Sequence, residues 1–211
     1  SVFTPEGYNG VKRYLFSFIK EIVKHLQEAS HCILFLDYDG TLVPICKEPS
    51  LAQLPSDTKK VLRDLSGNPF FSVGVISGRS LNEIKRMVGV QDLFYAGNHG
   101  FEIFFKNRLW IHPALEGFTS SLKKVVRELH SRTREINGII VEDKKFTASI
   151  HYRKVTEQSP GSILAVITEI LAPYPDAFTV ARGKKVFEIR PLVEWDKGKA
   201  VERLTELLSV K

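Results

Sequence analysis

Residues 33–42 of the 211-residue sequence read Ile33-Leu34-Phe35-Leu36-Asp37-Tyr38-Asp39-Gly40-Thr41-Leu42. The first four form a continuous apolar run, which is typical of a parallel β-strand covered on both faces. The run stops at two carboxylates and a glycine. Because ligands of open α/β sheets bind outside the carboxyl ends of the strands, we expect a reactive site at Asp37 and Asp39.

Asp37 and Asp39 can take different roles, because Asp37 stays in line with the strand while Asp39 turns into the loop. One carboxylate can attack a phosphorus atom and form an aspartyl phosphate. The other can protonate the leaving alcohol and later deprotonate the attacking water. Gly40 allows the tight turn that follows. A solvated Asp-Gly turn is the alternative interpretation of these residues taken alone.

Helices and strands alternate around this motif. Helical spacing of apolar residues predicts helices at residues 8–28, 57–65 and 81–88. Short apolar runs predict strands at residues 71–76 and 93–96. Residues 101–112 are predicted as a hairpin that turns at Lys106-Asn107. The alternation indicates an α/β fold.

A second unit of different pattern begins after Pro113. Its predicted helices are residues 115–136 and 161–171. Its predicted strands are residues 139–142, 146–152, 178–181 and 186–189. A last helix, residues 196–208, follows with Asp196 as its N-cap.

Composition narrows the class of protein. With 43% hydrophobic and 26% charged residues the chain is typical of globular proteins. A formal charge of +6 favours anionic ligands, but the basic residues are scattered, which argues against nucleic acid as a partner. Only Cys32 and Cys46 are present, so we expect no disulfide framework and a reducing, cytoplasmic location. No apolar stretch approaches the ~20 residues that cross a bilayer, so we expect no membrane partner.

Residues 37–42 resemble the first motif of the haloacid dehalogenase superfamily, D-x-D-G-T-[LV]. The resemblance implies a Rossmann-like parallel-sheet core with an inserted α+β cap of type C2. It implies Asp37 as nucleophile and Asp39 as general acid and base. It also implies Mg²⁺ as cofactor, held by the Asp37 carboxylate and the Asp39 carbonyl, and an oxygen-liganded hard cation suits phosphate transfer.

Two further motifs fit the same chemistry. Val75-Ile76-Ser77-Gly78-Arg79 predicts a strand that ends in a hydroxyl donor at a helix N-terminus, where phosphate binds well. With the first motif it predicts phosphate binding by Thr41, Ser77 and Gly78, although an ordinary turn and cap is the alternative. The resemblance implies that the Lys197 ammonium offsets the negative charge of the nucleophile and the phosphate. The alternative interpretation is a solvated lysine in the first turn of a helix. Lys199 is a less favoured candidate for the same role.

Finer motifs resemble the trehalose-6-phosphate phosphatases, which implies hydrolysis of trehalose 6-phosphate to trehalose and inorganic phosphate. They include residues 95–100, 141–144, 183–191 and 195–200, in the family's order, and the resemblance covers the chain from about Ile33 onward. It implies a core of residues 1–112 and 191–211 and a cap of residues 113–190 that closes over the sugar. The implied substrate-binding residues are Arg79, Asn98, His99, Glu142, Lys144, Arg153, Lys184 and Glu188. For His99 a structural role is the alternative, and His151 is given no ligand role.

One departure from the family pattern concerns the metal. The family has a fourth motif, G-D-D-x-x-[DE], and these 211 residues contain no Asp-Asp pair. We expect either that these residues are an incomplete part of the protein or that its Mg²⁺ site is weakened. Three functions stay open: a trehalose-6-phosphate phosphatase, a phosphatase for another phosphosugar such as sucrose phosphate or mannosylphosphoglycerate, and a non-catalytic sugar-phosphate-binding or regulatory domain. An upstream trehalose-phosphate synthase-like domain or partner also stays open.

Overall fold

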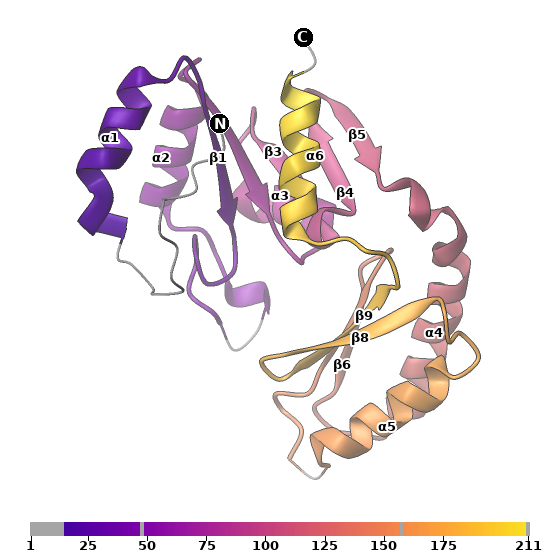
Figure 1. Ribbon diagram of the computed structural model, residues 1–211. Coiled ribbons are helices and arrows are strands. Elements are labelled where there is room, and N and C mark those ends of the chain that lie inside the picture. The colour runs from indigo at the N-terminus through magenta and orange to yellow at the C-terminus, as the bar shows by residue number, and fades with distance from the viewer. Residues whose placement is uncertain (1–14, 47–48, 157, 210–211) are drawn as a thin grey trace.

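The computed structural model describes residues 15–46, 49–156 and 158–209 and arranges them as two units, each built on its own sheet (Figure 1). The first sheet has the order β1-β2-β3-β4-β5. Its strands are β1 (Cys32–Asp37), β2 (Phe71–Ile76), β3 (Phe94–Gly97), β4 (Glu102–Phe105) and β5 (Arg108–Ile111). The first three are parallel, and β4 and β5 form the predicted antiparallel hairpin, which turns at Lys106 and Asn107. The α/β prediction is confirmed.

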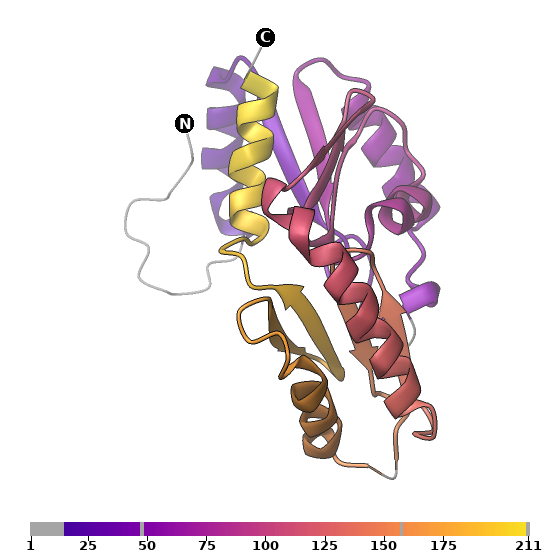
Figure 2. The same ribbon diagram turned by 90° about the vertical axis from the view of Figure 1, so that its right-hand side faces the viewer.

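Helices cover both faces of this sheet. Helices α2 (Ser56–Ser66) and α3 (Leu81–Val88) lie on one face, and α6 (Lys197–Ser209) lies on the other (Figure 2). Val73 and Val75 of β2 pack with Leu62 and Ile84 on the first face. Ile76 packs on the α6 face together with Phe94, Ile103 and Leu204. Two-sided covering is the reason that β2 and β3 are apolar along their length.

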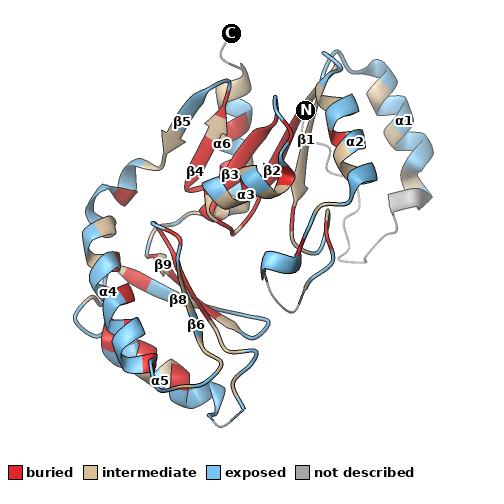
Figure 3. Ribbon diagram, turned by 180° about the vertical axis from the view of Figure 1, so that it is seen from behind, coloured by how far each residue is buried: buried red, intermediate tan, exposed pale blue. Residues whose placement is uncertain are grey.

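Strand β1 differs from this expectation. It lies at the edge of the first sheet, pairs with β2, and is half-buried along its whole length, although its apolar run predicts full covering. Helix α1 (Ile19–Glu28) precedes it and has no buried residue, as Figure 3 shows. Of the rest of the predicted helix, Leu15–Phe18 form a 3₁₀ helix, and residues 8–14 lie outside the described residues.

The second unit is a four-stranded antiparallel sheet with the order β6-β7-β9-β8. Its strands are β6 (Ile140–Asp143), β7 (Ala148–His151), β8 (Phe178–Gly183) and β9 (Val186–Pro191). Helices α4 (Phe118–Thr133) and α5 (Pro160–Leu171) pack against one face. In β9, Phe187 and Ile189 point to these helices, so Glu188, between them, points to the opposite face, toward the first unit.

Helix α4 is shorter than predicted. A 3₁₀ turn (Pro113–Gly117) precedes it, because His112 Nδ1 accepts the Ala114 N–H and caps that turn separately. Gly117, a poor helix former, ends this turn directly before the first residue of the helix.

Aromatic side chains tie together the two segments that connect the units. His112 ends the hairpin of the first unit, and Trp195 follows β9 on the way back; their ring centroids are 4.5 Å apart. Phe101 and Trp110 also contact the Trp195 ring. The two connecting segments therefore pack against each other through one aromatic cluster beside the first sheet.

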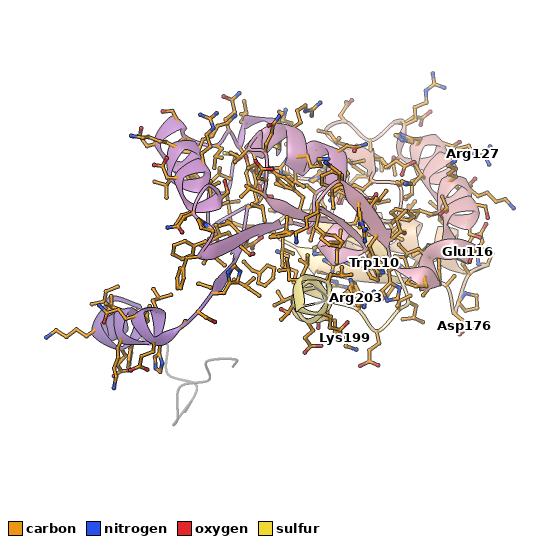
Figure 4. The ribbon with its side chains drawn as sticks, turned by 90° about the horizontal axis from the view of Figure 1, so that it is seen from above. Trp110, Glu116, Arg127, Asp176, Lys199 and Arg203 are labelled. Atoms are coloured by element: carbon orange, nitrogen blue, oxygen red, sulfur yellow. The ribbon has the colours of Figure 1, made fainter. Side chains whose placement is uncertain are left out.

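Helix α6 begins as predicted. The Asp196 carboxylate accepts the Lys199 N–H at 2.9 Å, which confirms the predicted N-cap. Farther along the helix, Arg203 lies over the Trp110 ring of β5, as Figure 4 shows from above. Within the described part of the chain, no helix is both long and apolar enough to span a bilayer.

The packing of α6 gives a first prediction. Leu204 is fully buried against the sheet, so Leu204→Ala should lower the free energy of unfolding by about 2–5 kcal/mol because it leaves a cavity. Leu192→Ala is the matched control, since Leu192 is 54% exposed, and should change it by less than about 0.5 kcal/mol. Urea denaturation measures both. Equal effects of the two substitutions would contradict the described packing.

Candidate active site

The centre of the site is an ion pair between Asp37 and Lys197. Asp37 is the last residue of β1 and Lys197 the first of α6, and Lys197 Nζ donates to Asp37 Oδ1 at 2.7 Å. The Tyr38 N–H donates to the same oxygen at 2.9 Å. Oδ2 has no hydrogen-bond partner among the described residues, and the Asp37 side chain is 43% exposed. A carboxylate that is oriented through one oxygen and open at the other can act as a nucleophile.

The loop after β1 turns sharply and is well anchored. Gly40 has φ +89°, a left-handed conformation that glycine adopts without steric cost. The Tyr38 ring is buried, and its hydroxyl donates to the Ala52 carbonyl at 2.7 Å. Thr41 is exposed on this loop and does not line the cleft described below. The loop therefore separates the directions of Asp37 and Asp39.

The second predicted motif lies next to the first because β1 and β2 are paired. Asp37 is opposite Ile76, so Ser77 follows directly at the end of the neighbouring strand. Ser77 is buried, and its Oγ accepts the Arg79 N–H at 3.1 Å. Gly78 lies under the His99 ring, where a Cβ atom would be 2.6 Å from Nε2. Only glycine therefore lets the histidine lie this close to the backbone.

A cleft of about 330 Å³ opens between the two units at this point. Ten predicted site residues line it: Asp37, Asp39, Gly78, Arg79, His99, Glu142, Lys144, Arg153, Lys184 and Lys197. The lining as a whole has seven basic and four acidic side chains, so it favours a ligand with negative charge. Its volume lies within the range of small-molecule sites.

Polar side chains of the second unit form the far wall. Glu142 of β6 and His151 of β7 are joined by a hydrogen bond of 3.1 Å, and the Arg153 guanidinium donates to the Lys184 carbonyl at 3.0 Å. Burial disfavours the charge on Glu142, but the hydrogen bond with His151 and the charge of Lys144 outweigh it and lower the pKa of Glu142. The wall therefore offers both carboxylate acceptors and cationic donors, which a hydroxyl-rich ligand needs.

Glu188 connects the two units beneath this wall and does not itself line the cleft. It lies 3.0 Å from His99 Nε2, accepts from Lys144 Nζ at 3.4 Å, and pairs with Arg190. Burial disfavours its charge, but the hydrogen bond with His99 and the nearby cations hold the pKa of Glu188 well below its ordinary value. Burial also lowers the pKa of His99, although Glu188 opposes this effect.

Asn98 is fully buried at the junction of the units and lies outside the cleft lining. Its amide nitrogen donates to Glu102 at 2.8 Å and to the Lys144 carbonyl at 2.9 Å. Its amide oxygen accepts from the Thr147 hydroxyl at 2.7 Å. These bonds hold the second unit against the end of β3, and they use the polar atoms that a substrate would otherwise contact.

Several site residues fall outside the set expected from the sequence. The sequence assigns His151 no ligand role, yet His151 lines the cleft, and Arg190, within the motif of residues 183–191, donates to Glu188. Glu83 was missed, although its i,i+4 spacing from Arg79 at the start of a predicted helix is a recognisable signal. The lining also includes Ile140, which is 48% exposed at the mouth of the cleft.

The oxygen ligands of the site are of the kind that Mg²⁺ binds, but there are fewer of them than Mg²⁺ needs. The Asp37 carboxylate and the backbone oxygen of Asp39 are hard ligands of the type that Mg²⁺ prefers, but Mg²⁺ takes about six ligands. Among the described residues no three His, Cys, Asp or Glu side chains come close enough together to hold a metal ion. The described residues therefore supply part of a Mg²⁺ shell.

Comparison with known proteins agrees with this geometry. The sequence model of the trehalose-phosphatase family matches residues 35–211. The chain belongs to this family. It is 36% identical over 186 residues to trehalose-phosphate phosphatase B of Arabidopsis thaliana, which covers 83% of the chain and 49% of the relative. The chain thus spans about half the length of the curated family members it matches.

Solved structures show the fold. The C-terminal domain of the C. albicans trehalose-6-phosphate phosphatase superposes with a TM-score of 0.74 at 24% identity, covering 88% of this chain and 65% of that one. A haloacid dehalogenase-like hydrolase from Bacteroides thetaiotaomicron gives 0.59 at 16% identity, covering 84% and 77%. The family's fold, a Rossmann-like core with an inserted α+β cap, is therefore the fold of this chain.

Glu188 makes stability depend on pH. Its folded-state pKa is depressed, so its stabilisation is present above the unfolded pKa of about 4.3 and is lost as pH falls through the lower folded value. Glu188→Gln should lower the free energy of unfolding at pH 7 by roughly 3 kcal/mol. It should also flatten the decline below about pH 4.3. Urea titrations from pH 7 to pH 3 test this, with exposed Glu116→Gln as control; a decline as steep as that of wild type would contradict it.

Proposed function

We propose that this protein is a phosphatase that hydrolyses trehalose 6-phosphate to trehalose and inorganic phosphate through an aspartyl phosphate at Asp37. The observation that carries the proposal is the Asp37 carboxylate, held by Lys197 through one oxygen and open at the other, in a cleft with excess positive charge. Membership of the trehalose-phosphatase family supports the substrate.

In the proposed reaction, Asp37 Oδ2 attacks phosphorus and the bond from phosphorus to the sugar oxygen breaks. Asp39 enters this step protonated, gives that proton to the sugar oxygen, and then takes one from the water that attacks the aspartyl phosphate, which frees Asp37 and releases inorganic phosphate. Lys197 Nζ, 2.7 Å from Asp37, offsets negative charge at the reacting centre. Mg²⁺, when bound by the Asp37 carboxylate and the Asp39 carbonyl, would neutralise phosphate charge.

We also propose the division of labour between the units. Residues 1–112 and 191–211 form the phosphatase core, and residues 113–190 form the cap that binds the sugar. Glu142, Lys144, Arg153 and Lys184 line the cap side of the cleft and supply acceptors and donors for sugar hydroxyls. Both cysteines are free thiols, which supports a reducing compartment, the cytoplasm.

The nucleophile is tested by Asp37→Asn. The amide removes the attacking oxygen anion at nearly constant volume, so phosphate release from trehalose 6-phosphate should fall by roughly a thousandfold or more. Phosphate is measured colorimetrically with Mg²⁺ present. Asp64→Asn on helix α2 is the matched control and should keep full activity. An inactive wild type, or an active Asp37→Asn variant, would contradict the proposal.

The sugar wall is tested by Glu142→Gln. Loss of a charged hydrogen-bond acceptor should raise KM for trehalose 6-phosphate about tenfold, since such bonds contribute roughly 1.5–3 kcal/mol. KM for 4-nitrophenyl phosphate, which has no sugar, should stay the same. Glu135→Gln, an exposed change elsewhere on the cap, is the control. A panel with sucrose 6-phosphate completes the test: a preference for that ester would correct the proposed substrate.

A further inference from the structure

Asp39 is held by a two-pronged bond from Arg79. The Arg79 guanidinium donates from Nε to Asp39 Oδ2 at 2.9 Å and from Nη2 to Oδ1 at 2.8 Å. This is the bidentate geometry in which arginine fixes the plane of a carboxylate as well as its position. A single ammonium group would fix only a distance.

Arg79 is itself braced. Its Nη1 donates to Glu83 Oε1 at 2.6 Å, and its side chain is only 8% exposed. Burial opposes its charge, but the two carboxylates outweigh burial and raise the pKa of Arg79, so it stays cationic. Ser80 caps helix α3 by accepting the Glu83 N–H at 3.3 Å, which fixes the helical turn that carries Glu83. Arg79 therefore has little freedom to turn toward a ligand.

We propose that Arg79, braced by Glu83, is a positioning residue that orients the Asp39 carboxyl group, protonated at a lone pair that Arg79 leaves open, for proton transfer to the leaving sugar oxygen. This role differs from the direct substrate contact that the sequence predicts for Arg79, and it rests on the proposed phosphatase function. The two oxygens of a carboxylate offer about four lone pairs, and the fork uses one on each oxygen. The remaining lone pairs stay available, since the Asp39 side chain is 38% exposed and lines the cleft.

Orientation matters here because proton transfer needs the two oxygens within about 2.6–3.2 Å. The contribution of Asp39 depends on the leaving group. A sugar alkoxide is a poor leaving group and needs the proton, whereas 4-nitrophenolate leaves without it. Hydrolysis of the aspartyl phosphate is common to all esters, so the leaving group affects only its formation, which kcat/KM reports. A defect confined to the position of Asp39 must therefore lower kcat/KM for sugar phosphates and spare kcat/KM for nitrophenyl phosphate.

The experiment is Arg79→Lys, which keeps the positive charge and removes the fork. We expect kcat/KM for trehalose 6-phosphate to fall roughly tenfold to a hundredfold, the cost of a misplaced catalytic group. We expect kcat/KM for 4-nitrophenyl phosphate to change less than about twofold, because formation of the aspartyl phosphate from that ester has little need of general acid catalysis. Glu83→Gln, which keeps Arg79 and weakens its brace, should show the same selectivity with a smaller loss. Arg86→Lys, an exposed arginine on the same helix, is the matched control.

A series of aryl phosphates gives a second readout that does not depend on the sugar. In Arg79→Lys, log kcat/KM should fall more steeply with rising pKa of the leaving phenol than in wild type. Equal losses of kcat/KM on all esters, or an unchanged slope, would overturn the positioning role. If Arg79→Lys does not fold, Glu83→Gln decides by the same criteria. A wild-type protein that hydrolyses none of the esters would contradict the proposed function itself. An active wild type, together with equal losses of kcat/KM in Arg79→Lys on all esters, would contradict only the role of Arg79.

Discussion

The pair of Lys197 and Asp37 is the contact on which the rest of the site depends. It joins residues 160 positions apart, and the whole second unit lies between them in the sequence. Both side chains are more than a third exposed, and exposed ion pairs add little to stability. In the proposed reaction the value of the contact is therefore chemical: it orients one oxygen of Asp37, and it places a cation where phosphate charge would accumulate.

The junction of core and cap follows a different principle, because its charges are buried. Glu188, 12% exposed, meets His99 of the core and Lys144 and Arg190 of the cap. A buried network of this kind has to be satisfied as a whole, since removing one member leaves its partners desolvated and unpaired. The network therefore favours one docking geometry over neighbouring ones. The neutral bonds of Asn98 to Lys144 and Thr147 specify the same geometry from the opposite side.

The features that could be predicted from the sequence are those that depend on neighbouring residues. The strand at residues 186–189 and the N-cap at Asp196 depend on neighbouring residues, and both are confirmed. The motifs around Asp37 and Lys197 placed the two residues at the ends of a strand and a helix, and the structure brings them together. The partner of Asp39 was not predictable in this way, because Arg79 is 40 residues away and its direction depends on the register of β1 with β2. His151 faces the cleft only because β6 and β7 pair as they do.

The turn after β3 shows how backbone conformation produces the junction. Asn98, His99 and Gly100 have φ values of +49°, +58° and +94°, three successive residues in the left-handed region. Asn and His are among the residue types enriched there, and glycine adopts it freely, so this sequence lowers a conformational cost that most side chains would incur. The turn directs Asn98 to the cap backbone at Lys144 and His99 to Glu188. A β-branched residue at either position would oppose the turn, and both links between core and cap would be lost with it.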